Sequence, residues 1–199
     1  MKVPVLALAA ILPLLAALPA GTDRAKVLGS PNAPIVIEIY SSFDCPHCKI
    51  LHEELLPMLM RDYVTPGKVA VISREFPLWG QYHPYARAAA DLATAAARIG
   101  KYEPVADALF KNQMTWTSNG QVWETVASVL TLSEQNKVHA LMKDPSVDAE
   151  VQHDVDQAGR DGVNQTPSLF VTAKGQRFPL PPGVPTWELL KAMLDNQLK

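Results

Sequence analysis

Two cysteines three positions apart are the residues of this sequence best suited to chemistry. The 199-residue chain contains only Cys45 and Cys48, within FDCPHCKILHEELLPML from 43 to 59. In the chain-entropy model, a disulfide closing a loop of about four residues stabilises a fold by only about 2 kcal/mol. Such a bond would brace a protein of this length poorly. The spacing therefore indicates a pair of thiols that opens and closes.

The flanking residues predict a strand followed by a helix that begins at the cysteines. Residues 33–43, APIVIEIYSSF, contain the run of β-branched and apolar residues that is typical of a buried strand. Apolar residues at 50, 51, 55 and 59 then recur at helical spacing. Pro46 suits the first helical turn, where its missing N–H has no partner to lose. We therefore expect Cys45 at the helix N-terminus and Cys48 one turn inside.

A helix N-terminus would stabilise a thiolate at Cys45. Unpaired backbone N–H groups and the positive end of the helix dipole lie there. The dipole contributes up to about 2 kcal/mol, which corresponds to roughly one and a half pKa units. His47, between the cysteines, can add a hydrogen bond and a positive charge. A stabilised thiolate favours the reduced pair, so the oxidised pair would pass its disulfide to other thiols more readily.

The N-terminal residues predict export. Lys2 is followed by VPVLALAAILPLLAALPA, an uncharged run over residues 3–20 that contains three prolines and ends in small residues. The run is short for a spanning helix, and we interpret residues 1–20 as a signal peptide. Leu18 stands where a smaller residue is preferred before cleavage, so an uncleaved membrane anchor is the alternative. In either case we expect a periplasmic or other extracytoplasmic location, where disulfides persist.

Composition excludes several other classes of protein. Hydrophobic residues make up 48% and charged residues 19%, as in an ordinary globular domain. The 18 Lys and Arg residues are scattered and are balanced by 20 Asp and Glu, so we expect no nucleic-acid partner. His52 follows the cysteines by one turn, but structural zinc requires a second ligand pair and the chain has no third cysteine. We therefore expect no metal.

Three segments resemble the DsbA family of thioredoxin-fold thiol–disulfide oxidoreductases. Residues 45–48, CPHC, have the family's active-site pattern. GVNQTPSLFV, 162–171, is similar to the family's loop that carries a cis-proline, here Pro167 after Thr166. REFPLWGQYHPYARAAA, 74–90, resembles the segment that leads into the family's helical insertion. The resemblance covers roughly residues 29–198.

The resemblance implies an α/β, thioredoxin-like fold in which helices flank a central mixed sheet and an all-helical insertion forms a lid. Residues 29–80 and 161–198 would form the thioredoxin-like domain, and residues 81–160 the insertion. The sequence pattern agrees with this order of elements. It predicts a strand at 69–76, helices between 83 and 160, a hairpin at 168–180 that turns at Lys174-Gly175, and a helix at 185–198.

The resemblance also implies roles for individual residues. Cys45 would form a mixed disulfide with a substrate, and Cys48 would resolve it. The expected catalytic residues are Cys45, Pro46, His47 and Cys48. The backbone of Thr166, turned toward Cys45 by a cis bond to Pro167, would pair with an extended substrate peptide. No cofactor is implied besides the Cys45–Cys48 disulfide itself.

These features predict a monomeric enzyme that donates its disulfide to unfolded or reduced exported proteins, and the resemblance implies that a membrane quinone-linked partner recharges it. Phe43, Trp79 and Tyr82 are candidates for an apolar rim that binds such substrates, and His83 can approach the active site from the lid. A disulfide isomerase or a reductase of the same fold is the alternative. A metal carrier or a peptide-binding module without enzymatic activity is the alternative from another class.

The sequence departs from the family at two positions. DsbA-like proteins commonly have an acid six residues before the first cysteine, and here that residue is Ile39. Glu38 precedes it and, by strand alternation, faces the opposite side of the sheet, where Arg74 is its expected partner. Protons beneath the cysteines must therefore move through water or another group. Thr166 also resembles the isomerases and some DsbA relatives more than DsbA itself.

Overall fold

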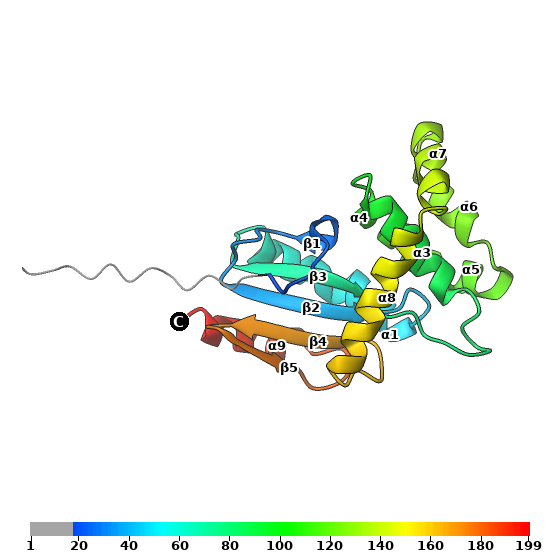
Figure 1. Cartoon of the computed structure of the whole chain (residues 1–199). Helices are drawn as coiled ribbons and strands as arrows, with labels where there is room; N and C mark the ends of the chain where they lie inside the picture. Colours follow the sequence, from blue (N-terminus) through cyan, green and yellow to red (C-terminus); the bar gives the residue numbers. More distant parts are fainter. Residues whose placement is uncertain (1–17) are drawn as a thin grey trace, which may run out of the picture.

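The computed structural model describes residues 18–199 and contains a five-stranded mixed sheet in the order β1-β3-β2-β4-β5 (Figure 1). The strands are β1 (Val27–Leu28), β2 (Ile35–Ser41), β3 (Val69–Glu75), β4 (Ser168–Ala173) and β5 (Gln176–Pro179). β2 and β3 are parallel, and the other neighbouring strands pair antiparallel. The structure confirms the predicted thioredoxin-like fold class.

The predicted signal peptide, residues 1–20, lies almost entirely outside the described residues. Of its last residues, Leu18 is partly buried against a cluster that includes Val36 and Ile72. Within residues 18–199, no helix combines the length and the apolar character that crossing a bilayer requires.

The parallel β2–β3 pair is connected by one continuous helical stretch, because parallel neighbours need a crossover. The stretch consists of α1 (Pro46–Ile50), η2 (Leu51–Leu55), α2 (Leu56–Leu59) and η3 (Met60–Val64). Together with the C-terminal α9 (Trp187–Gln197) it covers one face of the sheet. Leu51, Leu55 and Leu190 pack there against Ile35 and Ile37. This packing fixes the axis of the helix that begins at the cysteines.

Two π turns, η2 and η3, interrupt the regular geometry of this helix. Pro57 has no N–H and cannot donate to a carbonyl of the preceding turn. A π turn directly before α2 changes the hydrogen-bonding step there, so that Pro57 falls in the first turn of α2. The sequence predicted helix from Cys45 to about Tyr63. The structure confirms the extent of the helix and adds the two π turns.

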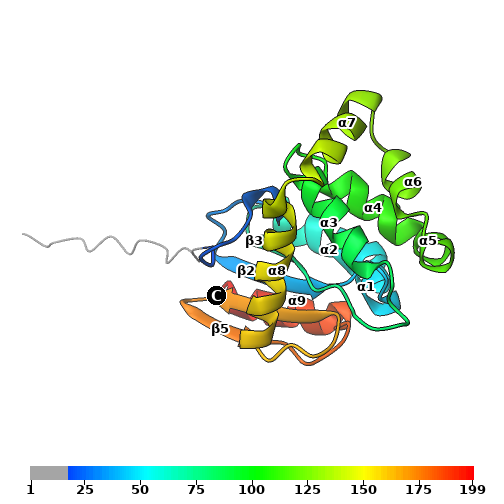
Figure 2. The ribbon, with the colours of Figure 1, turned by 45° about the vertical axis from the view of Figure 1, so that its right-hand side comes forward.

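The remaining helices lie between β3 and β4 in the chain. They are α3 (Ala86–Ala97), α4 (Tyr102–Lys111), α5 (Gln113–Asn119), α6 (Val122–Ala127), α7 (Leu132–Leu141) and α8 (Pro145–Arg160). Figure 2 shows α3–α7 stacked beyond the end of the sheet where α1 begins, while α8 runs back across the face opposite α9. Helix α8 contacts both α3 and β3. The division of the chain into a thioredoxin-like domain, residues 29–80 and 161–198, and an insertion, residues 81–160, stays a prediction.

The hairpin at the C-terminal side of the sheet forms where the sequence predicts it. Lys174 and Gly175 join β4 to β5, with φ values of 51° and 75°. Positive φ at both central residues defines the turn type that matches the twist of the flanking strands. Strand β1, which pairs antiparallel with β3 and follows the short η1 (Arg24–Lys26), was not predicted. Two residues are too few for a recognisable strand pattern.

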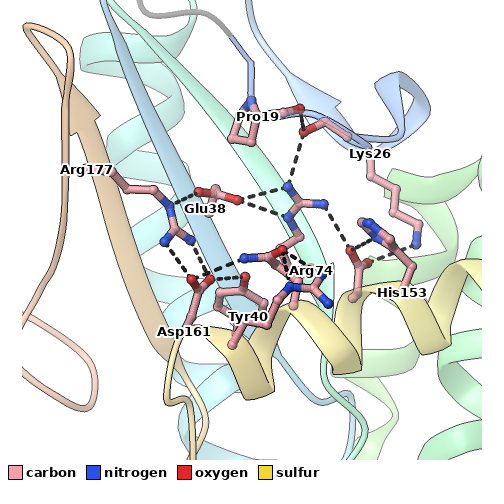
Figure 3. A network of polar contacts seen from close by, with 12 residues as sticks. Pro19, Lys26, Glu38, Tyr40, Arg74, His153, Asp161 and Arg177 are labelled. Atoms are coloured by element: carbon pink, nitrogen blue, oxygen red, sulfur yellow. Dashed lines mark hydrogen bonds and ion pairs between the residues drawn. The ribbon is translucent and has the colours of Figure 1, made fainter.

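A network of buried charges joins α8 to the sheet on the face opposite the cysteine helix (Figure 3). Arg74 donates to Glu38 at 2.9 Å, which confirms the predicted pair, and to Asp154 of α8 at 3.0 Å. Arg177 of β5 donates to the second oxygen of Glu38 at 2.7 Å. Glu38, Arg74 and Asp154 are all buried. Each charge is therefore compensated within the network, as burial requires.

We predict that Arg74→Ala destabilises the protein strongly. The substitution leaves Asp154 without its guanidinium partner and Glu38 with Arg177 alone. Removing one member of a buried ion pair typically lowers the free energy of unfolding by about 3–5 kcal/mol. Urea unfolding of the two proteins measures this difference. Arg61→Ala is the control, because Arg61 forms an exposed pair with Asp62, and its unfolding midpoint should stay that of the unsubstituted protein. Equal losses of unfolding free energy in the two variants would contradict a stabilising role for the buried ion pairs of Arg74.

Candidate active site

The two cysteines lie where β2 ends and α1 begins. Cys45 has extended backbone angles, φ −81° and ψ 121°, and directly precedes the first helical residue, Pro46. Cys48 lies one turn inside α1, and both side chains are buried free thiols. The geometry is therefore that of the reduced pair, with Cys45 at the unpaired N–H groups of the helix as predicted.

Several donors converge on the sulfur of Cys45 and lower its pKa to about 5, well below the value of an ordinary thiol. The largest contribution is a hydrogen bond from the Cys48 thiol. Burial opposes ionisation, but the Thr166 hydroxyl and the backbone N–H groups of Cys48 and His47 favour the anion. Hydrogen bonds to the charged form of a group always act in this direction. Cys45 is therefore a thiolate at neutral pH.

The pKa of Cys48 is shifted in the opposite direction to that of Cys45. Burial raises the pKa of its thiol far above the ordinary range, and the neighbouring Cys45 anion raises it further. The Ser41 hydroxyl and the backbone of Ser42 act against this rise without cancelling it. One thiol of the pair is thus ionised and the other holds its proton. This asymmetry is the main electrostatic feature of the site.

The loop before β4 lies against Cys45, as the resemblance to the DsbA family implies. The Thr166–Pro167 peptide bond is cis, and the Cys45 thiol lies 3.4 Å from the carbonyl oxygen of Thr166. The Thr166 hydroxyl is buried, and among residues 18–199 no other group holds it in a hydrogen bond that would compete with the Cys45 sulfur. It is therefore available to the sulfur anion. Residues separated by 121 positions in the chain meet at this point.

The ring of His47 is exposed, as is Pro46. Within residues 18–199, the polar contacts of His47 that bear on Cys45 come from its backbone N–H, so tuning by the imidazole stays a prediction. His52 instead pairs with Asp107 of α4 at 2.6 Å. Across the described part of the chain, no three His, Cys, Asp or Glu side chains are placed to share a metal ion.

The helical insertion holds the cysteine turn in place through contacts that sequence reasoning missed. The buried Gln113 of α5 donates its amide N–H groups to the carbonyl of Phe43 at 2.6 Å and to that of Cys45 at 3.0 Å. The Lys49 ammonium donates to the carbonyl of Phe110 at 2.7 Å. About 70 residues separate Gln113 from its partners, so no local pattern indicates these bonds.

The turn before Cys45 is held from its other side by the segment that follows β3. The backbone N–H of Leu78 donates to the Ser42 hydroxyl at 3.1 Å. The Ser42 hydroxyl in turn donates to the carboxylate of Asp44, which also contacts Nδ1 of His83 at 2.5 Å. His83 thus reaches the active-site turn from the lid side and contacts the carboxylate of Asp44.

The candidate apolar rim is only partly on the surface. Phe43 is wrong as a rim residue, because it is buried against Phe110 with ring centroids 5.0 Å apart. Trp79 and Tyr82 are 70% and 83% exposed, and Met114 of α5 is 85% exposed. A cavity of about 410 Å³ beside Pro46 is lined by Tyr82 and Met114, among others. An apolar surface therefore adjoins the cysteines.

Comparisons with known proteins agree on one family. A family model described as Thioredoxin matches residues 21–196. The chain is 25% identical over 179 residues to "Probable disulfide bond formation protein D" of Bacillus cereus, covering 86% of this chain and 78% of that protein. It resembles the crystal structure of alpha-DsbA1 of Wolbachia pipientis with a TM-score of 0.71 and 23% identity, covering 86% of this chain and 89% of that one. The latter likeness shows the fold.

Another relative is much longer than this chain. The chain is 28% identical to a Na(+)/H(+) antiporter, NhaA 3, of Salinispora tropica over 166 residues, and this match covers 81% of this chain. It spans only 24% of that relative's length. The similarity therefore concerns one part of the antiporter. The transport activity in its name belongs to that protein.

We predict that Gln113→Leu loosens the active-site turn. Leucine has a similar shape but donates no hydrogen bond, so the carbonyl of Phe43 loses its donor, while that of Cys45 keeps only the backbone N–H of Lys49. Each buried carbonyl left without a donor costs about 1–3 kcal/mol of stability. Urea unfolding measures the loss, and hydrogen exchange should show faster opening of residues 43–48. Gln121→Leu, in an exposed position of the same insertion, should change neither. An unchanged rate of hydrogen exchange at residues 43–48 in Gln113→Leu would contradict the role of Gln113 in holding the turn.

Proposed function

This chain belongs to the thioredoxin family, with the fold of its DsbA-like members, and we propose that it donates a Cys45–Cys48 disulfide to other proteins. The names of its relatives support the broad activity, protein thiol–disulfide oxidoreductase. The direction of transfer, the substrates and the partner are the parts that we propose. The redox centre is the cysteine pair itself, so no further cofactor takes part.

The observation that carries this proposal is the unequal ionisation of the two thiols. A pKa of about 5 makes Cys45 a stable anion at neutral pH. The anion exists only in the reduced protein, so its stabilisation favours the reduced form over the disulfide form. A protein whose reduced form is stabilised is an oxidant toward ordinary thiols. The same low pKa makes Cys45 a good leaving group when the transfer is completed.

Transfer would proceed in two exchange steps. A substrate thiolate attacks the sulfur of Cys45, the Cys45–Cys48 bond breaks, and Cys48 leaves and takes up a proton. A second substrate thiolate then attacks the substrate sulfur of the mixed disulfide, and Cys45 leaves as its stable anion. The substrate loses two electrons to the cysteine pair. Of its two thiol protons, one balances the proton on Cys48 and the other goes to solvent.

The surroundings of Cys45 suit an unfolded polypeptide as substrate. The backbone of Thr166 lies beside the sulfur and can pair with an extended peptide, as an added strand would. Tyr82 and Met114 present exposed apolar side chains at the cavity beside Pro46, which suits unfolded chains that expose apolar residues. We propose that the substrates are reduced proteins exported from the cytoplasm and that a membrane partner restores the disulfide.

Equilibration with glutathione tests the direction of transfer. The oxidised protein is incubated with reduced and oxidised glutathione in varied ratios, and alkylation with mass spectrometry counts the free thiols. We expect the pair to stay reduced in mixtures that oxidise ordinary protein thiols, and we expect the oxidised protein to form the disulfide of a reduced two-cysteine peptide. A pair that stays oxidised in strongly reducing mixtures would contradict the donor role and favour a reductase.

Single-cysteine variants test which sulfur forms the mixed disulfide and which sulfur resolves it. Cys48→Ser keeps the reactive Cys45 and should accumulate a mixed disulfide with glutathione, because nothing resolves it. Cys45→Ser keeps only the buried, protonated thiol and should react at least about tenfold more slowly at neutral pH, since the thiolate is the nucleophile. The two variants are matched in size and polarity. Equal accumulation in both would overturn the assignment.

A further inference from the structure

A second cavity lies beneath the cysteines, on the face of the sheet that carries the cysteine helix. Its volume is about 190 Å³, and its lining combines residues of β2, β3, the cysteine helix and α4. Its polar lining residues include Cys48, Ser41, Ser73, Glu75 and Tyr102. The cavity also touches exposed residues such as Glu103. Water can therefore reach it from the surface.

Glu75 is the buried acid of this cavity. It is the last residue of β3 and is 2% exposed. The hydroxyl of Tyr102 donates to its carboxylate at 2.8 Å. Burial raises the pKa of Glu75 to about 7, against the opposing charge of Lys26. A carboxyl group in this state can both give and accept a proton near neutral pH.

Strand register places Glu75 beside the group that contacts Cys48. In the parallel β2–β3 pair, Ser41 is the partner of Glu75. Both residues line the cavity together with Cys48, and the Ser41 hydroxyl acts to lower the pKa of the Cys48 thiol. A hydroxyl both donates and accepts hydrogen bonds, so it can pass a proton between its neighbours. Ser41 is therefore the neighbour of the acid across the strand pair and lines the cavity together with the thiol.

Ile39 of β2 leaves the usual position of the family's buried acid without a carboxyl group, which directs attention to Glu75 on the neighbouring strand β3. Ile39 occupies the position where DsbA-like proteins commonly have an acid, and it lines the same cavity with an apolar side chain. Glu38 faces the other side and is committed to Arg74 and Arg177. Glu75 is thus the buried carboxyl group that lines the cavity together with Cys48.

We propose that Glu75 supplies a proton to Cys48 when the disulfide opens, through the Ser41 hydroxyl or water in the cavity. The inference rests on the proposed function. When a substrate thiolate attacks Cys45, the leaving Cys48 sulfur takes the Ser41 proton, and Ser41 takes the proton of the Glu75 carboxyl group. Glu75 is left as a carboxylate and regains a proton from cavity water. The reverse transfer removes the proton from Cys48 when it attacks a mixed disulfide.

The direction of the pH dependence follows from the protonation of Glu75. Below about pH 7 its carboxyl group is neutral and can donate, and above that pH it cannot. The rate constant for attack by a thiolate should therefore fall as pH rises through about 7. The charged and titratable groups that face Glu75 are Lys26 of η1, Tyr102 of α4, Glu150 and Asp154 of α8, and Cys48 of α1.

The test compares Glu75→Gln with the unsubstituted protein. Oxidised protein is mixed with reduced glutathione from pH 5 to 9, and acid quenching with mass spectrometry follows loss of the disulfide. The rates are divided by the thiolate fraction of glutathione. We expect the unsubstituted protein to show an inflection near pH 7. Glu75→Gln should lack the inflection and react at least about tenfold more slowly at pH 6, with the pKa of Cys45 unchanged.

Glu103→Gln is the matched control, because it removes the same charge at the mouth of the same cavity. It should keep both the rate and the inflection. An inflection that persists in Glu75→Gln, or an equal loss in Glu103→Gln, would overturn the inference while leaving disulfide donation intact. If Glu75→Gln does not fold, Ser41→Ala decides: loss of the inflection supports the relay, and an unchanged profile rejects it. Failure of the unsubstituted protein to oxidise glutathione would instead reject the proposed function.

Discussion

The coupling of an ionised Cys45 to a protonated Cys48 is the constraint on which the rest of the site depends. It requires one sulfur at the first turn of a helix, where N–H groups are unpaired, and a second sulfur one turn deeper in the core. The end of β2 and the first turn of α1 meet both requirements. The other contacts of the site, from Thr166 and Gln113, keep donors and backbone aligned with that geometry.

The alternation of side chains along β2 and β3 separates two kinds of buried charge. Glu38 and Arg74 point to the face covered by α8, where each charge has a fixed partner and stabilises the packing of that helix. Ser41 and Glu75 point to the opposite face, into the cavity beneath Cys48. Burial raises the pKa of Glu75 to about 7, so its carboxyl group can exchange protons near neutral pH. The two faces therefore suit stability and proton transfer respectively.

The helical insertion contributes to the site as a support and not only as a cover. Gln113 bonds the carbonyls on either side of Asp44, and Lys49 is bonded to the end of α4. These contacts connect the cysteine turn to helices that follow it by more than sixty residues. The position of the reactive sulfur therefore depends on the packing of the insertion as well as on the sheet.

Local patterns in the sequence predicted most of the elements but few of the long-range contacts. The strand before Cys45, the helix after it and the hairpin at Lys174-Gly175 have signals within a few residues, and the structure has all three. The π turns were not predicted, although Pro57 inside the helical pattern was a usable signal. The roles of Gln113 and Glu75 depend on packing and register between segments far apart in sequence, which no single segment specifies.

The central claim is that Cys45 ionises far more readily than an ordinary cysteine. The most direct measurement is a pH titration of thiolate absorbance in the reduced protein, with Cys45→Ala as the reference. We predict one transition near pH 5 that is absent from the variant, with Cys48 still protonated through the neutral range. A first transition at about pH 8.5, the value of an unperturbed thiol, would contradict the account.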